Sequence, residues 1–361
     1  CRMRITDDPN TTEPREAFAQ LTITVTESTR DPGVRSEFPP NPWGAGINYV
    51  WANEEEQSTA ADYMAPMDQI ALQWDQVEPE QHKVYDWTLL DEMLEQAAEN
   101  RRHVSVQINS RLPAWVFDHI AKTGTARDMS SPQFWDPDYI QYYKDLITAL
   151  ADHIASSPYK NLVTYVRQQW NAVHTETCFF EEGDPMRSWT DNPDWVWPSD
   201  GHRYETEWTQ EIALDYEREI QSHFISQFKP LDIGVAMRVI LARLPESEMD
   251  DYFTNDSPTE WVLWTSNKAM MWDGGIGHTR QFTFMRCFGA PGFSETWGTA
   301  PDRVEEENPD LTLAQDIYGI VLRALAVGFP YIGIYGEDLA SVSDHPEFGD
   351  VFDFGKKYAG W

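Results

Sequence analysis

Acidic, amide and tryptophan side chains recur directly after short apolar runs along this sequence. The side chains that follow these runs are Trp74 and Asp75, Asn109 and Arg111, Asn171 and His174, Arg238, Asp273, Glu295 with Trp297, and Glu337 with Asp338. We find no Gly-x-Ser-x-Gly elbow, no Cys–His pair and no histidine cluster spaced for zinc, so we expect no metal and no cofactor. Cleavage of a glycosidic bond requires two carboxyl groups and side chains that bind hydroxyl groups. The pattern therefore favours glycoside chemistry.

The aromatic content supports a carbohydrate ligand. The chain has 16 Trp, 15 Tyr and 17 Phe residues, more tryptophan than a hydrophobic core usually needs. Sugar rings present apolar C–H faces that pack well on aromatic side chains. We therefore expect a polysaccharide or oligosaccharide as the binding partner.

Short apolar runs alternate with amphipathic segments from Trp43 onward, which is typical of βαβ units and a parallel sheet. We predict strands near 43–49, 69–74, 103–109, 162–170, 233–238, 269–273, 293–297 and 331–335. We predict helices at 86–100, 138–156, 205–228 and 313–328, the last ending at Gly328 before Pro330.

Eight strands in this order predict an α/β fold, a closed (β/α)8 TIM barrel with long βα loops. An open doubly wound sheet is the alternative, but no glycine-rich phosphate loop follows the first strand. The 361 residues suit one barrel at 43–361, preceded by an extension at 1–42 with a short strand at 21–25. Segment 177–204 follows the fourth strand without periodicity, and we interpret it as a loop that covers the substrate.

The net charge of −33 argues against nucleic-acid partners, which require Lys and Arg to neutralise phosphates. A salt-tolerant protein and a merely soluble one are both consistent with this charge. No apolar run is long enough to span a membrane. Cys1 is consistent with the lipidated first residue of a bacterial lipoprotein, although a start without biological meaning explains it equally well. We expect a secreted, periplasmic or outer-surface protein, and the sequence indicates no oligomeric state.

Two stretches resemble the clan A superfamily of retaining glycoside hydrolases. Residues 74–91, WDQVEPEQHKVYDWTLLD, resemble the second-strand motif of that clan, and residues 104–115, VSVQINSRLPAW, resemble its third strand. The resemblance covers about 43–340, and the second-strand motif is its most specific part. Among clan members, the chain is most similar to family 42 β-galactosidases and to marine galactan hydrolases. This resemblance implies a galactose-rich substrate such as carrageenan, furcellaran, agar-type or plant galactan.

The hallmark of clan A is an Asn-Glu pair after the fourth strand, in which Glu is the acid/base. Here Asn171 is followed by Ala172, which cannot transfer a proton. We interpret Ala172 as the replacement of a catalytic Glu, which would leave the chain inactive and able to trap uncleaved substrate. A naturally inactive relative is the alternative, and a third is that Glu176 supplies the acid.

The nucleophile of this clan ends the seventh strand, where this chain has Glu295 beside Trp297. Glu295 could instead be an exposed loop glutamate without a catalytic role. Glu337 after the eighth strand is the alternative candidate for the nucleophile. The resemblance otherwise assigns Glu337 to binding of sugar hydroxyls. In the retaining mechanism Glu295 forms a glycosyl-enzyme intermediate, and a Glu at position 172 protonates the leaving oxygen and then activates water.

The remaining candidates are substrate-binding residues. The resemblance implies that Asn171 binds the hydroxyl next to the reacting carbon. Asp273 is a candidate hydroxyl acceptor, or else a turn residue before Gly274, and His174 is either a substrate neighbour or a structural histidine. The other expected members of the binding cup are Trp74, Asn109, Arg111 and Trp297. The leading hypothesis is a retaining β-glycosidase that acts on a galactose-rich polysaccharide, and the alternative is a non-catalytic carbohydrate-binding barrel.

Overall fold

The structure is a computed structural model. The chain divides into two compact units, Cys1–Val34 and Arg35–Trp361, and all the described residues belong to the second. The described residues are 46–50, 67–109, 111–123, 132–167, 195–207, 209–238, 270–273, 292–295, 298–306, 309–327 and 331–358. The predicted extension at 1–42, with its strand at 21–25, lies outside them.

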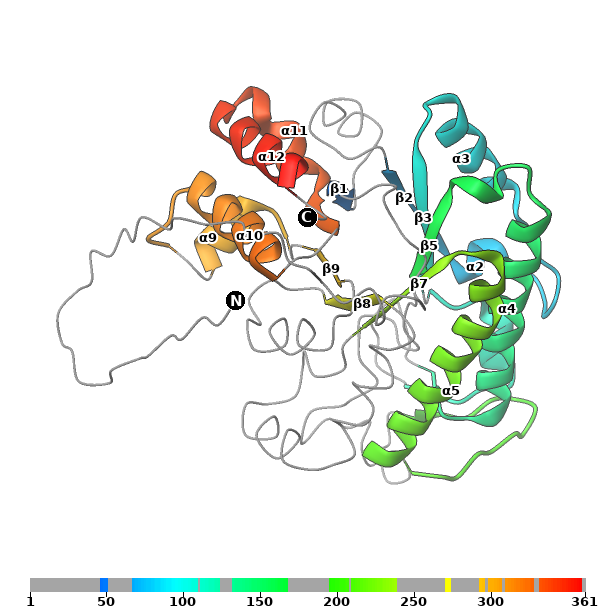
Figure 1. The fold of residues 1–361 in the computed structure, drawn as a ribbon. Coiled ribbons are helices and arrows are strands. Elements are labelled where there is room, and N and C mark those ends of the chain that lie inside the picture. Colours follow the sequence, from blue (N-terminus) through cyan, green and yellow to red (C-terminus); the bar gives the residue numbers. More distant parts are fainter. Residues whose placement is uncertain are drawn as a thin grey trace, which may run out of the picture. The chain divides into compact units, whose positions relative to one another are not determined.

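Eight parallel strands form the central sheet (Figure 1). They are β1 (Gly46–Val50), β2 (Met67–Gln73), β3 (His103–Asn109), β5 (Val163–Arg167), β7 (Gly234–Arg238), β8 (Met270–Asp273), β9 (Gly292–Glu295) and β10 (Tyr331–Tyr335). Their spatial order is β1-β10-β9-β8-β7-β5-β3-β2, and every adjacent pair is parallel. Strands that follow one another along the sequence are therefore adjacent in the sheet, as successive βα units in a barrel require.

The two strands at the ends of this order, β1 and β2, also lie next to each other. This contact closes the sheet into a barrel, so the prediction of a (β/α)8 barrel is confirmed. All eight predicted strands are present, with limits that differ by a few residues from those the sequence indicates. Buried Val and Ile residues in β2, β3, β5, β7 and β10 explain part of this agreement, because β-branched side chains favour extended backbone.

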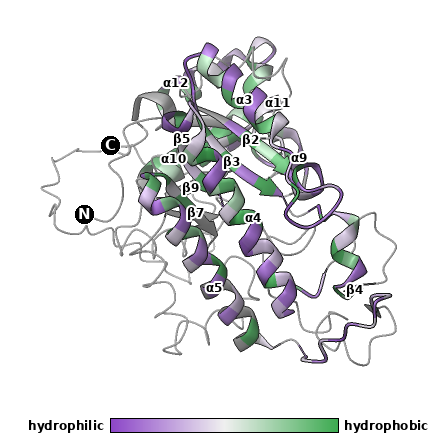
Figure 2. Ribbon diagram, turned by 90° about the vertical axis from the view of Figure 1, so that its right-hand side faces the viewer, coloured by the Kyte–Doolittle hydropathy of each residue, from purple (hydrophilic) through white to green (hydrophobic). Residues whose placement is uncertain are grey.

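The helices cover the outer side of the strands (Figure 1). The four predicted helices are confirmed as α3 (Thr88–Glu99), α4 (Pro137–Ser156), α5 (Gln210–Phe228) and α10 (Leu313–Val327). The described residues also form helices that were not predicted, namely α2 (Trp74–Val77), α9 (Ala300–Glu306), α11 (Gly336–Ala340) and α12 (Pro346–Tyr358). Hydrophilic and hydrophobic residues alternate along α4 and α5 in Figure 2, as expected for helices with one face in the core.

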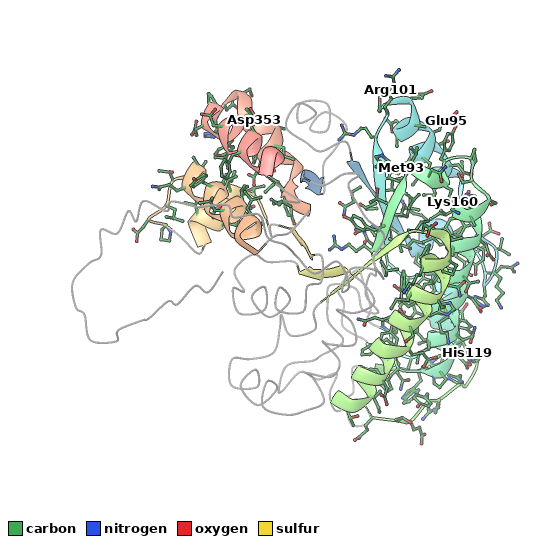
Figure 3. The ribbon with its side chains drawn as sticks, in the orientation of Figure 1. Met93, Glu95, Arg101, His119, Lys160 and Asp353 are labelled. Atoms are coloured by element: carbon green, nitrogen blue, oxygen red, sulfur yellow. The ribbon has the colours of Figure 1, made fainter. Side chains whose placement is uncertain are left out.

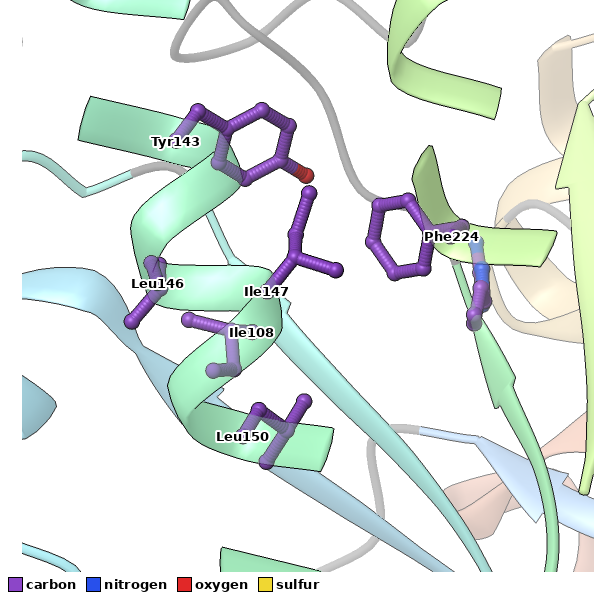
Figure 4. Close-up of a pocket in the computed structure, with 7 residues that line it drawn as sticks. Ile108, Tyr143, Leu146, Ile147, Leu150 and Phe224 are labelled. Carbon is purple, nitrogen blue, oxygen red and sulfur yellow. The ribbon is translucent and has the colours of Figure 1, made fainter. Parts of the chain in front are cut away.

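Helix α4 shows how the sequence specifies these elements. Asp136 caps its N-terminus by accepting a hydrogen bond from the Asp138 N–H, and Pro137 occupies the first turn, where proline is tolerated. Its buried residues recur at helical spacing and pack against Ile108 of β3 and Phe224 of α5 (Figure 4). The cavity left between them is about 10 Å³, close to the size of one water molecule. It is a packing void and is too small for a sugar.

His223 connects α5 to α4. Its Nε2 lies 2.9 Å from the Thr148 hydroxyl and 3.0 Å from the Lys144 carbonyl. Burial lowers the pKa of His223 below its ordinary value, and the Lys144 carbonyl partly opposes that shift. The folded chain therefore keeps this imidazole neutral at pH values where the unfolded chain protonates it.

The lowered pKa of His223 predicts a loss of stability in mild acid. The unfolded state binds the additional proton as the pH falls through about 6.5, so the free energy of unfolding declines from there down to the folded pKa. We expect His223→Gln, which stays neutral, to make this decline shallower. Urea unfolding at pH 7.5 and pH 5.5 measures it, and an equally steep decline in the variant would contradict the prediction.

A two-stranded antiparallel sheet joins the loops that follow β3 and β5. It pairs β4 (Lys122–Thr123) with β6 (Trp195–Val196). Two side chains before α4 reinforce this junction, because Gln133 Nε2 donates to the Tyr204 carbonyl at 2.7 Å and Trp135 Nε1 donates to the Thr206 carbonyl at 2.7 Å. Among the described helices, none has the length and apolar character that crossing a membrane requires.

Candidate functional site

The carboxyl ends of the eight strands form one rim of the barrel, because all the strands run in the same direction. Asp273 and Glu295 are the last residues of the neighbouring strands β8 and β9. Asp273 pairs with Ser294 in register, and Glu295 pairs with Gly333 of β10. Two of the acids that the sequence analysis selected therefore end adjacent strands of the rim.

Asn109 ends β3 on the same rim, 8% exposed, and belongs to a row of amides. Gln69 Nε2 donates to Gln107 Oε1 at 3.2 Å, and Gln107 Nε2 donates to Asn109 Oδ1 at 3.0 Å. Ile108 packs against α4, so its strand neighbours Gln107 and Asn109 face the barrel interior. The row therefore fixes the orientation of the Asn109 amide.

The sequence analysis missed Gln69 and Gln107, although a signal for them exists. Along 103–109 the residues alternate between apolar and polar, and the apolar set faces the helices. The polar set must therefore face the barrel interior. Arg167, the last residue of β5, is 2% exposed and pairs in register with Gln107, and it lines the small void beside Ile108 and Phe224.

Arg111 lies at the rim with a largely exposed side chain. Its Nε donates to Asp75 Oδ2 at 2.6 Å, and the Asp75 N–H donates to the Arg111 carbonyl at 2.9 Å. These two bonds tie the segment after β3 to the segment after β2. The Arg111 guanidinium is therefore held at the rim by Asp75, and its predicted role near the substrate stays a prediction.

Trp74 is buried, whereas a tryptophan that stacks on a sugar ring must be exposed to the ligand. It is 1% exposed and its ring packs between Tyr139 and Tyr143 of α4, at centroid distances of 5.9 and 5.5 Å. Its Nε1 donates to Glu78 Oε2 at 2.7 Å. Trp74 continues the outward-facing series of Ile70 and Leu72, so its ring lies in the core between barrel and helix. This placement does not support the expectation that Trp74 binds substrate.

Glu78, from the same second-strand motif, is fully buried and structural. Besides Trp74, it accepts the Lys83 backbone N–H at 2.5 Å and lies 3.2 Å from His82 Nδ1. Burial raises the pKa of Glu78, and these hydrogen bonds partly oppose the shift. His82 continues the network to Asp145 of α4 at 3.0 Å. The motif therefore anchors the segment after β2 to α4.

Glu337 is exposed in the first turn of α11, directly after β10. Its neighbour Asp338 is buried instead and accepts the Ala300 N–H at 2.8 Å, at the start of α9. Arg303 Nη2 lies 3.2 Å from Asp338, and Arg303 Nε donates to Asp316 at 2.8 Å. Arg303 also donates to the Gly298 carbonyl at 2.5 Å. These bonds fix the chain shortly after Glu295.

Removal of the Arg303 guanidinium is expected to destabilise the barrel strongly. Arg303→Met leaves the buried Asp316 and Asp338 without their cation, and breaking a buried pair in this way costs about 3–5 kcal/mol. Arg111→Met is the matched control, because its pair with Asp75 is exposed and worth about 0–1 kcal/mol. Guanidinium unfolding of both variants measures the difference, and similar losses would contradict a special role for the buried network.

A cluster of histidines and aspartates lies in the loops after β3 and β5. Its three possible metal ligands are His119, Asp138 and His202. No such cluster was predicted, because the three residues are 19 and 64 positions apart and share no short motif. Loop residues that meet only in the folded chain give no periodic signal.

Other predicted site residues lie outside the described part of the chain. They are Asn171, Ala172, His174 and Trp297. The described part of the fourth barrel strand, β5, ends at Arg167, four residues before Asn171 in the sequence, so the role predicted for position 172 stays a prediction.

The comparisons with known proteins support the fold. No family model matches the sequence, and no curated protein matches it. The catalytic domain of a Paenibacillus polymyxa β-amylase has a TM-score of 0.57 at 9% identity, over 86% of this chain and 97% of that one. A family 5 xyloglucanase from Paenibacillus pabuli has a TM-score of 0.52 at 8% identity, over 87% and 98%.

A cold-adapted β-galactosidase from Rahnella sp. R3 has a TM-score of 0.53 at 12% identity. The match covers 89% of this chain and 57% of the β-galactosidase, so the chain spans little more than half of that protein's length. All three are glycoside hydrolases by name. The fold of this chain is therefore that of TIM-barrel glycoside hydrolases, and the low identities extend the likeness no further than the fold.

Proposed function

We propose that this chain is a retaining β-glycosidase barrel with Glu295 as nucleophile and position 172 as the site of the acid/base. The observation that carries the proposal is the position of Glu295 at the carboxyl end of the seventh strand of an eight-stranded parallel barrel. Active sites of such barrels lie at this face, and their reacting groups come from the ends of several strands.

The surroundings of Glu295 supply the other requirements of the reaction. Asp273 ends the adjacent strand, and the fixed amide of Asn109 lies on the same rim, where both would bind sugar hydroxyls. Asn171 and position 172 come after the fourth strand in the sequence, and a Glu at position 172 would be the proton donor that the mechanism needs. With Ala172, the proposed site therefore has a nucleophile and substrate-binding residues but no acid/base residue.

A missing acid does not affect the two chemical steps equally. Attack by Glu295 on the anomeric carbon proceeds without an acid when the leaving group is already a stable anion. Hydrolysis of the glycosyl-enzyme then stalls, because no carboxylate activates the water. The present chain should therefore react once with an activated substrate and stop.

The proposed substrate is a galactose-rich polysaccharide. Support comes from the resemblance of the sequence, over about residues 43–340, to family 42 β-galactosidases and marine galactan hydrolases. A polymer of this kind is met outside the cell, which agrees with the expectation of a secreted or surface protein.

The test uses dinitrophenyl β-glycosides of galactose and of short galacto-oligosaccharides, so that both exo and endo action are covered. We expect a burst of about one dinitrophenolate per chain, followed by slow turnover that azide accelerates by attacking the glycosyl-enzyme. The azide product should have the β configuration, since two displacements retain it. A burst that Glu295→Gln leaves intact, or no release with any of these glycosides, would contradict the proposal.

A non-catalytic carbohydrate-binding barrel is the second candidate, favoured by the Ala at position 172. It predicts that the chain binds a galactan in affinity electrophoresis and releases no dinitrophenolate. It also predicts that Ala172→Glu leaves the bound polymer uncleaved.

A further inference from the structure

We propose that His119, His202 and Asp138 form a binding site for a divalent transition metal such as Zn²⁺, which joins the loops after β3 and β5. His119 follows the short helix at Ala114–Asp118, Asp138 lies in the first turn of α4, and His202 belongs to the segment before α5. Figure 3 places His119 at the lower end of α4, far from Arg101 before β3.

The distances between the three ligand atoms suit one ion. Asp138 Oδ2 lies 2.7 Å from His119 Nε2 and 3.9 Å from His202 Nε2, and all three atoms lie within 4.8 Å of one another. Ligands of a tetrahedral Zn²⁺ at about 2.0–2.1 Å are roughly 3.3 Å apart. The separations of 2.7 and 3.9 Å lie on either side of that value.

The second nitrogen of His119 is held as it would be in a metal site. Its Nδ1 lies 2.5 Å from Asp200 Oδ2, and the other Asp200 oxygen accepts the His202 backbone N–H at 2.8 Å. Metal-bound histidines almost always donate their other N–H to such a carboxylate, which fixes the tautomer and aims the free nitrogen at the ion. Asp200 therefore orients His119 toward Asp138 and His202.

The charge of the cluster also favours a cation. Asp136 Oδ2, almost fully buried, lies 2.8 Å from His202 Nε2, so Asp136, Asp138 and Asp200 place three carboxylates around two imidazoles. The imidazole rings stack at 4.1 Å. A divalent ion would offset two of the three negative charges, and two imidazole ligands select Zn²⁺ or a similar metal over Mg²⁺ and Ca²⁺.

The backbone around the site is already fixed without the ion. The β4–β6 pairing and the bonds of Gln133 and Trp135 connect the same two loops. Asp136 caps α4 and so sets the position of Asp138. The His119, Asp138 and His202 side chains keep some exposure, which gives an ion access and leaves room for water as a further ligand.

The experiment is calorimetric titration of the chelator-treated chain with ZnCl₂ at pH 7.5. We expect one equivalent to bind, with Mg²⁺ failing to compete. His202→Gln and Asp138→Asn should weaken binding at least about 100-fold, and Asp200→Asn, which only orients His119, about 10–100-fold. His153→Gln is the matched control, because His153 also pairs with an aspartate, Asp91, far from the cluster.

A thermal measurement separates metal binding from simple loss of hydrogen bonds. Zn²⁺ at about 100 times its Kd should raise the Tm of the parent chain by about 3–5 °C, and should leave the Tm of Asp138→Asn unchanged. Circular dichroism confirms that each variant is folded. The proposal is overturned if the parent chain binds no Zn²⁺, or if folded His202→Gln and Asp138→Asn bind it as tightly as the parent chain.

Discussion

Ala172→Glu is expected to turn this chain into an active galactan hydrolase. A positioned general acid/base contributes about 10²–10⁴-fold to the rate, and the substitution would supply it next to Asn171. The gain should be largest on the natural polymer, whose sugar leaving group needs a proton. Reducing-end release from a panel of marine and plant galactans measures it and identifies the substrate.

Ala172→Gln is the matched control for this gain. Gln has nearly the shape of Glu, but its amide group cannot act as a general acid toward the leaving oxygen. The rate with Glu should also fall as the pH rises through the raised pKa that a buried acid requires. Equal rates for the Glu and Gln variants would mean that position 172 is not the acid/base. If Glu176 is the acid instead, the unmodified chain already cleaves the polymer, and Glu176→Gln abolishes that cleavage.

Glu295→Gln, made in the Ala172→Glu background, is expected to abolish cleavage. Without the nucleophile no glycosyl-enzyme forms, and loss of a covalent nucleophile lowers kcat by at least about 10⁴-fold. Binding of the polymer should change little, because Gln keeps the size of Glu and can still bond a sugar hydroxyl, with its oxygen accepting or its NH₂ group donating. Initial rates and affinity electrophoresis on the same polymer separate the two effects.

Glu337→Gln is the control and also tests the rival assignment. Glu337 is exposed on α11 after the eighth strand and is expected to bind a sugar hydroxyl, so its loss should mainly raise KM. If Glu337→Gln abolishes kcat while Glu295→Gln is active, the two residues exchange roles.

The barrel could be predicted from the sequence because its elements carry strong periodic signals. The run 103–109 alternates apolar and polar residues, and α4 repeats buried residues at helical spacing between a proline start and Ser157. Each of these patterns lies within one element, so it can be recognised without knowing which elements pack against it. The short helices α2 and α11 carry no such repeat, because one turn is too short to show a period.

The site could be predicted only in part, because side-chain direction and long-range contacts decide the rest. Trp74 was expected in the binding cup by its position after a strand, yet its outward direction buries it against α4. The series of Ile70, Leu72 and Trp74 contains this information, since alternate strand residues share a face. His119 and His202 meet because the β4–β6 pair and the hydrogen bonds of Gln133 and Trp135 join two loops that are distant in the sequence, and no local sequence pattern indicates such a contact.

The most direct test of the central proposal is mass spectrometry of this chain after brief reaction with dinitrophenyl β-galactoside and its oligosaccharide analogues. Because Ala172 cannot activate water, the glycosyl-enzyme should accumulate. The predicted result is one added glycosyl group per chain, on the peptide that contains Glu295, and its loss on incubation with azide. No adduct with any of these substrates, or an adduct on another residue such as Glu337, would contradict the assignment of Glu295 as the nucleophile.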